Sequence, residues 1–268
     1  MLLENWPNPI RKLLLWILGI QWAHRLLIRL SIDNPSKLIL LERIFQRNRF
    51  DIQVSADDKI PNNQNTIFVS NHPHGLFDGL VLIWLGCKHG HDCRAIGRHF
   101  LSVFEPIKDW FLLVKIDSNR KTSVASSVRK QATHFLNEGG SLAITAAGRV
   151  SVSRPIWAPA QDLAWKTGAV KLSQATGSPI VLVYIDVKHS IVRQLAQRIH
   201  GVARALIQVW GFRFGRSQKL HVYVLDVIAP EQLPAGSAQE QTHWLQTRFD
   251  LLSKQRHSDP IQVQSKHS

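Results

Sequence analysis

The sequence predicts one α/β domain with a mostly parallel central sheet flanked by helices. Three observations lead to this fold class. Seven short apolar runs alternate with helix-length segments from about residue 50 onward, no stretch rich in Pro, Gly or Ser divides the 268 residues, and 44% of the residues are apolar. Alternation of strands with helices is typical of parallel sheets, and this apolar content is sufficient for a sizeable core.

Each candidate strand is an apolar run of strand length next to turn-forming residues. In chain order the candidates are Phe50–Val54, Thr66–Ser70, Arg94–Gly97, Leu112–Ile116, Ser141–Thr145, Ile180–Ile185 and Leu220–Val227. The predicted helices are Asp78–Leu85, Thr122–Glu138, Asp162–Thr176, Ser190–Trp210 and Ala238–Lys254. Ser190–Trp210 has an apolar face opposite a basic face, which is typical of a surface helix and also suits contact with lipid headgroups.

Residues 10–30 are predicted to form an amphipathic helix at a membrane interface. The segment is apolar, but polar residues interrupt it: Gln21, His24, Arg25 and Arg29. A spanning helix needs about 20 nearly uncharged residues, so this segment is not expected to cross a bilayer. With Trp16 and Trp22 at the headgroup level, the helix would lie in the plane of the interface. The alternative is a helix that caps the domain core.

The charge balance predicts an anionic partner. The chain has 33 Lys and Arg against 19 Asp and Glu, a formal net charge of +14, and nine Trp residues. Such an excess favours nucleic acid or a membrane surface with acidic lipids, and the Trp content favours the membrane. No zinc-finger spacing or RNA-recognition aromatic motif supports nucleic acid, so we expect no nucleic-acid partner.

Two cysteines cannot form a disulfide framework, which favours a reducing cytosol. They belong to a cluster, Cys87-Lys88-His89-Gly90-His91-Asp92-Cys93, whose spacing matches no standard zinc site. We interpret the cluster as a solvated turn between a helix and a strand; a metal site is the alternative. Because Glu4 and Pro7 interrupt the start of the chain, we expect no secretory signal.

The stretch Val69-Ser70-Asn71-His72-Pro73-His74-Gly75-Leu76-Phe77-Asp78-Gly79 places ionisable side chains where a predicted strand is followed by a helix. Such a turn lies at the carboxyl edge of the sheet, where α/β folds commonly bind ligands. A hydrogen bond from histidine to Asp78 would fix the imidazole tautomer and make the other ring nitrogen a general base. No GxSxG, HExxH or reactive cysteine supplies a nucleophile, so the expected chemistry is activation of a substrate hydroxyl or amine. The alternative is a capping aspartate beside two surface histidines.

Residues 71–79 resemble the first motif of the glycerolipid acyltransferase superfamily, which is Asn-His followed after a few residues by Asp. Five residues separate His72 from Asp78, rather than the usual four. This longer spacing, with Pro73 after the histidine, resembles the branch that includes ornithine-lipid acyltransferases and haemolysin-like proteins. Because His74 lacks a preceding Asn, His72 is the favoured base.

Three further blocks resemble the family in the expected order, so the similarity spans about residues 40–230. The second block is Phe111–Arg120, in which Asp117 and Arg120 stand at comparable places. The third block, Leu142–Ser151, matches this branch at Ala147, Gly148, Val150 and Ser151, but has Ala146 in place of Pro and Arg149 in place of Glu. The fourth block is Ile180–Ser190, with Leu182 where Pro is usual.

The resemblance implies transfer of a fatty acyl chain from an acyl carrier protein or coenzyme A thioester, as co-substrate, to the hydroxyl or amine of a lyso-lipid or lipid-like acceptor. It implies no bound cofactor or metal. His72 would be the base, Asp78 its partner, and amides around Gly148 would stabilise the oxyanion. The other residues expected at the substrate are Asn71, His74, Gly75, Asp117, Arg120, Arg149, Ser151 and Arg154. Because Arg149 reverses the charge of the usual Glu, the acceptor is open, and a phosphate-bearing acceptor is one hypothesis.

The expected organisation is an N-terminal interfacial segment over residues 1–39, an acyltransferase domain over 40–256 and a flexible polar tail over 257–268. We expect a peripheral protein that binds anionic lipids on the cytoplasmic face of a membrane, which in a bacterium is the inner membrane. Its pathway would be phospholipid or aminolipid synthesis. The alternative function is a non-catalytic lipid-binding protein of the same fold, which only the altered third block supports.

Overall fold

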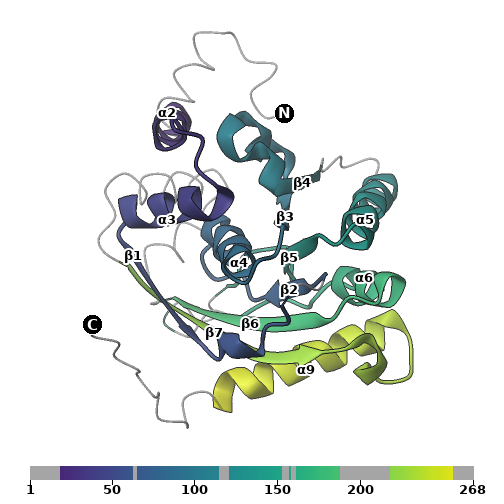
Figure 1. The fold of residues 1–268 in the computed structure, drawn as a ribbon. Helices are drawn as coiled ribbons and strands as arrows, with labels where there is room; N and C mark the ends of the chain where they lie inside the picture. The colour runs from purple at the N-terminus through teal and green to yellow at the C-terminus, as the bar shows by residue number, and fades with distance from the viewer. Residues whose placement is uncertain are drawn as a thin grey trace.

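The computed structural model describes residues 19–62, 65–114, 121–152, 157, 161–187 and 218–255. Within these residues the chain forms a seven-stranded sheet in the order β1-β7-β6-β2-β5-β3-β4, with helices on both faces (Figure 1). The strands are β1 Phe50–Ser55, β2 Ile67–Ser70, β3 Cys93–Arg98, β4 Phe111–Val114, β5 Ser141–Thr145, β6 Ile180–Val187 and β7 Gln218–Ile228. The predicted α/β fold is therefore confirmed.

Five of the six neighbouring strand pairs are parallel, and only β6 and β7 run antiparallel. Strand β2 lies between β5 and β6, and all four of its residues are buried. A strand covered on both faces reads as a continuous apolar run, which explains the sequence Ile-Phe-Val before Ser70. The carboxyl end of β2 therefore delivers the chain to the middle of the sheet edge.

Two helical layers cover the sheet. The helices are α2 Ile20–Leu30, α3 Lys37–Arg47, α4 Leu76–Lys88, α5 Lys121–Asn137, α6 Gly168–Thr176 and α9 Ala238–Gln255. Short 3-10 helices are η1 Asp57–Lys59, η2 His99–Val103, η3 Glu105–Trp110 and η4 Pro230–Gln232. Phe68 of β2 packs in the apolar core with α3 and α4, whereas Ile67 and Val69 pack in a second core with α5, α6 and α9. This alternation follows from the two-residue period of a strand.

Every predicted strand overlaps an observed one, whereas the observed helices differ from the predicted ones in two places. The helix predicted from Asp162 begins only at Gly168. The backbone before Gly168 forms hydrogen bonds with other segments instead. The Lys166 N–H donates to the Ala146 carbonyl, and the Trp165 N–H donates to the Gln246 side chain. Helix α3 was not predicted, and it spans the predicted boundary at residues 39 and 40. The predicted helix Ser190–Trp210 lies outside the described residues.

The described part of the helix predicted over residues 10–30 is the helix α2, which agrees with that prediction. Among the residues that the structure describes, no helix is both long enough and apolar enough to cross a bilayer. Trp16 and the predicted tail over residues 257–268 lie outside them. The predicted division into segments stays a prediction.

The turn predicted around the two cysteines is present between α4 and β3, with Lys88, Gly90 and Asp92 exposed, but part of it is buried. Cys93 begins β3 and is buried, and His91 is also buried. The His91 ring forms hydrogen bonds with the Ser141 hydroxyl at 2.9 Å and the Pro61 carbonyl at 2.8 Å, so it joins three segments of the fold. No group of three or more His, Cys, Asp or Glu side chains in the described ranges could hold a metal ion.

Candidate active site

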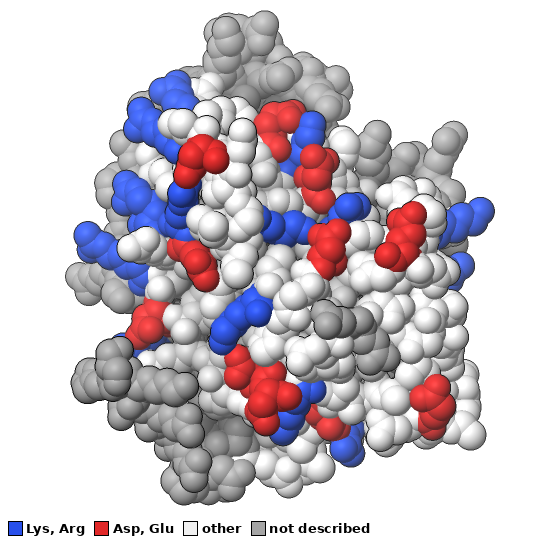
Figure 2. Space-filling view, in the orientation of Figure 1, with Lys and Arg blue, Asp and Glu red and all other residues white. Residues whose placement is uncertain are grey.

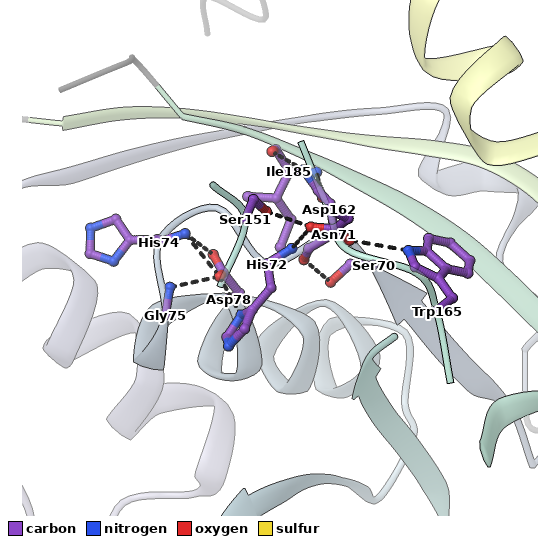
Figure 3. A network of polar contacts seen from close by, with 10 residues as sticks. All are labelled: Ser70, Asn71, His72, His74, Gly75, Asp78, Ser151, Asp162, Trp165 and Ile185. Carbon is purple, nitrogen blue, oxygen red and sulfur yellow. Dashed lines mark hydrogen bonds and ion pairs between the residues drawn. The ribbon is translucent and has the colours of Figure 1, made fainter. Parts of the chain in front are cut away.

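A tight turn connects β2 to α4 at the carboxyl edge of the sheet. Gly75 is the N-cap of α4 and has φ 109° and ψ −117°, a conformation that side-chain-bearing residues rarely adopt. The helix then starts at once, with Asp78 in its first turn. This geometry folds Asp78 back toward the residues that precede the helix (Figure 3).

The predicted contact between His72 and Asp78 is present. The Nδ1 atom of His72 lies 2.8 Å from Oδ2 of Asp78, and the Asp78 side chain is completely buried while the His72 side chain is 17% exposed. The same carboxylate accepts the main-chain N–H groups of Gly75 at 2.8 Å and His74 at 3.0 Å. Because a carboxylate accepts and does not donate, it favours the tautomer with hydrogen on Nδ1 and a lone pair on Nε2.

His74 occupies a different environment from His72. Its ring is buried and lies edge-on to Phe50 and Phe77, with centroid separations of 5.9 and 4.9 Å. Figure 3 shows this ring directed away from the Asp78 carboxylate, which contacts only the His74 backbone. His72 is therefore the histidine of this turn that the structure pairs with Asp78.

Asn71 anchors the turn to the neighbouring strand β6. Its side-chain amide donates to the Ile185 carbonyl at 3.0 Å, and its carbonyl oxygen accepts the Ile185 N–H at 2.8 Å. The side chain thus takes the place of a strand partner for a residue of β6, and Asn is the residue type that offers one donor and one acceptor in this arrangement. Asn71 positions the turn from inside the protein.

A second carboxylate, Asp162, holds the turn from the other side. Its Oδ1 accepts the His72 N–H at 3.2 Å and also a hydrogen bond from the Ser151 hydroxyl. Its Oδ2 accepts the indole N–H of Trp165 at 3.1 Å, and the Ser151 N–H donates to the His72 carbonyl at 2.9 Å. Burial raises the pKa of the Asp162 carboxyl, an effect that the hydrogen bonds from Ser151, His72 and Trp165 oppose.

Sequence reasoning missed Asp162 and Trp165 as parts of this site. Both were assigned to a predicted helix, and neither belongs to a motif that the sequence displays. Ser151, in contrast, was expected near the substrate, and the structure brings it to the His72 turn through main-chain and side-chain contacts. Asp117, Arg120 and Arg154 lie outside the described residues.

Gly148 and Arg149 form an exposed turn after β5. Gly148 has φ +61°, and its N–H donates to the Thr145 carbonyl at 2.9 Å. A Cβ atom at Gly148 would lie 2.8 Å from Nζ of Lys166, so glycine also leaves room for that lysine. The Arg149 side chain is exposed, and it takes no part in the hydrogen-bond network around His72.

A family model described as Acyltransferase matches residues 51–186, which is half of the chain. The chain belongs to the acyltransferase family. The matched segment runs from β1 to β6 and contains the His72 turn, Ser151 and Asp162. The protein is therefore an acyltransferase enzyme. Its resemblance to the glycerolipid acyltransferase superfamily is supported at this level, whereas the branch stays a prediction.

The fold of this acyltransferase is also that of a solved structure. The crystal structure of the 1-acyl-sn-glycerophosphate acyltransferase PlsC from Thermotoga maritima is similar to it with a TM-score of 0.53 and 13% sequence identity. The similarity covers 90% of this chain and 95% of that chain. At this identity the match establishes the fold alone. A search of curated protein sequences finds no match to the chain.

Proposed function

We propose that this acyltransferase moves a fatty acyl chain from an acyl carrier protein or coenzyme A thioester to the hydroxyl or amine of a lyso-lipid or lipid-like acceptor. The single observation that carries the proposal is the 2.8 Å contact between His72 and the buried Asp78. A base that is oriented in this way, in a chain whose sequence has neither a GxSxG motif nor a reactive-cysteine motif, suits direct attack by a substrate group. The pathway would be phospholipid or aminolipid synthesis.

In the proposed reaction, Nε2 of His72 takes the proton of the acceptor hydroxyl or amine as its oxygen or nitrogen attacks the thioester carbonyl carbon. Asp78 stabilises the imidazolium that forms. When the tetrahedral intermediate collapses, the carbon–sulfur bond breaks and the proton passes from His72 to the leaving sulfur. The Gly148 N–H is committed to Thr145, so the oxyanion would be stabilised by other main-chain amides of this turn, such as that of Arg149.

The remaining predicted site residues fall into three groups under this proposal. Asn71, His74, Gly75 and Ser151 hold the turn that carries His72, through the contacts described above. Arg149 is exposed beside Gly148 and would meet the acceptor, for which its charge favours a phosphate group. Asp117, Arg120 and Arg154 stay predicted substrate contacts.

The proposed location is the cytoplasmic face of a membrane, where lipid acceptors and soluble thioester donors meet. The net charge of +14 supports peripheral attachment to anionic lipid. Figure 2 shows Lys and Arg side chains along the upper left of the view, over α2 and α3. Attachment of this kind weakens as salt is added, because ions screen the charges.

The test is transfer of a labelled acyl chain to a panel of lyso-lipid acceptors with each thioester donor. We compare the wild-type protein with His72→Ala and with His243→Ala, whose side chain is exposed on α9. Loss of the base in His72→Ala should lower the transfer rate about 10²–10⁴-fold, while His243→Ala should keep the wild-type rate. Equal rates for wild type and His72→Ala would reject the mechanism. In the same panel, Arg149→Glu should lose preference for phosphorylated over unphosphorylated acceptors, and an unchanged preference would reject that role.

A further inference from the structure

A pocket of about 430 Å³ lies beside α2, outside the site described above. Among the described residues it is lined by three basic side chains, Arg25, Arg29 and Arg47, by Gln21, and by apolar side chains of α2. These apolar side chains are Trp22, Leu26 and Leu30. Arg47 comes from the last turn of α3, so the pocket lies where the two helices meet.

The three arginines of this pocket differ from their basic neighbours in having no acidic partner in the described part of the chain. Close by, Arg43 pairs with Asp33 and Lys37 pairs with Asp92. No carboxylate of a described residue lines the pocket, and its three arginine side chains are exposed. Guanidinium groups that converge without a carboxylate attract an anion, and phosphate matches their forked hydrogen-bonding geometry.

The apolar side chains that line the pocket indicate which kind of phosphate compound would bind. Trp22, Leu26 and Leu30 are only partly buried, and Ile28 and Ile32 beside them are 46% and 76% exposed. A free phosphate ion gains nothing from such a surface, whereas an amphiphile buries apolar area there. Tryptophan beside arginine is also typical of the level where lipid headgroups meet acyl chains.

We propose that the pocket formed by Arg25, Arg29 and Arg47 binds the phosphate group of an anionic membrane phospholipid. This lipid is bound as an anchor and is distinct from the acyl acceptor. This inference rests on the proposed function of the enzyme at a membrane surface, but it does not depend on the role of His72.

The position of the pocket would determine how a bound lipid orients the protein relative to the membrane. Arg47 ends α3, and Phe50, three residues later, begins β1. The Phe50 ring contacts the rings of Phe77 and His74, with centroids 4.4 and 5.9 Å apart, and both of these residues belong to the turn or helix that carries the dyad. A lipid bound at Arg47 would therefore hold the sheet edge that bears His72 toward the membrane.

The experiment measures binding of the full chain to vesicles of phosphatidylcholine alone and of phosphatidylcholine mixed with phosphatidylglycerol. The test variant is Arg25→Gln, Arg29→Gln and Arg47→Gln together. The matched control is Arg129→Gln, Lys130→Gln and Lys171→Gln, which removes the same charge from exposed positions on α5 and α6. Each arginine at a lipid surface contributes about 1 kcal/mol, so the pocket variant should bind the anionic vesicles about 10²-fold more weakly.

The proposal expects the control to bind anionic vesicles much more tightly than the pocket variant, and each single substitution to weaken binding about five-fold. Equal loss in both triple variants would overturn it, because general surface charge would then explain attachment. Inorganic phosphate or glycerol phosphate that binds the wild-type pocket as tightly as the vesicles do would also overturn it. The proposal would also be overturned if the pocket variant lost binding to an RNA duplex while its binding to vesicles stayed unchanged.

Transfer activity separates this proposal from the proposed function. With acceptor and donor dispersed in neutral detergent, the pocket variant should transfer acyl chains at the wild-type rate, because the pocket is not part of the catalytic machinery. Loss of transfer under these conditions would overturn the anchor and make the pocket part of the acceptor site. His72→Ala should show the reverse pattern, with vesicle binding retained and transfer lost.

Discussion

Two carboxylates hold His72, and they act on different parts of it. Asp78 lies six residues after His72, is completely buried and contacts the imidazole ring. Asp162 lies 90 residues away in sequence and contacts the main-chain N–H of His72, together with Ser151 and Trp165. The chemistry of the ring is thus set by a local carboxylate, whereas the position of the turn is set by a distant one.

This difference predicts different consequences when each carboxylate is replaced. Loss of Asp78 removes both the orientation of the imidazole and the stabilisation of its charged form. Loss of Asp162 leaves the ring pairing in place and disturbs only the support beneath it. Variants of Asp78 should therefore lose more transfer activity than variants of Asp162.

Asp78→Asn should cause the largest loss of the set, about 10²–10⁴-fold in kcat, because an amide neither stabilises an imidazolium nor accepts from all three N–H groups. Steady-state transfer with a saturating thioester measures this loss. Asp58→Asn, at an exposed position, is the matched control and should leave kcat unchanged. A kcat for Asp78→Asn that is close to wild type would show that the ring pairing is only structural.

Asp162→Asn should lower kcat by about ten-fold, while KM for the thioester stays close to wild type. The asparagine oxygen can still accept from His72, but the amide group faces the Trp165 indole N–H, and an unsatisfied buried donor costs about 1–3 kcal/mol. Ser151→Ala, which removes one donor and leaves the His72 contact, should cost less. If Asp162→Asn matched Asp78→Asn in effect, the distinction between ring and support would be wrong.

The smallest effect concerns stability as a function of pH. Because burial raises the pKa of Asp162, the native state holds this proton more tightly than the unfolded chain. The contribution of Asp162 to stability therefore falls as pH rises from the ordinary aspartate pKa of 3.8 through the raised value. Urea unfolding across this window should show wild type losing stability relative to Asp162→Asn. A relative gain would contradict the direction of the shift.

The same contrast explains how much of the site could be predicted from the sequence. The pairing of His72 with Asp78 depends on a strand, a turn and the first turn of a helix, all within one short segment, so spacing alone predicts it. Asp162 reaches His72 only because the segment after β5 folds back against the turn. No local pattern encodes such a contact, and the helical periodicity from residue 162 favoured the wrong local structure there.

The fold shows the same division between local and distant information. Apolar runs predicted the strands, because burial on both faces requires them to be apolar. His91 was misplaced in solvent, since its partners Ser141 and Pro61 are 50 and 30 residues away in sequence. Helix α3 was missed although Ser36 caps it by accepting the Ile39 N–H, a start signal that the sequence contains.

The central claim is that His72 and Asp78 act as one unit, and a double-mutant cycle on the transfer rate tests it most directly. If Asp78 works only through the imidazole, adding Asp78→Asn to His72→Ala should cause little further loss, so the double variant should match His72→Ala alone. The control is Asp58→Asn added to His72→Ala, which should cause no further loss of transfer rate. Losses that multiply, so that the double variant falls far below His72→Ala, would contradict the account.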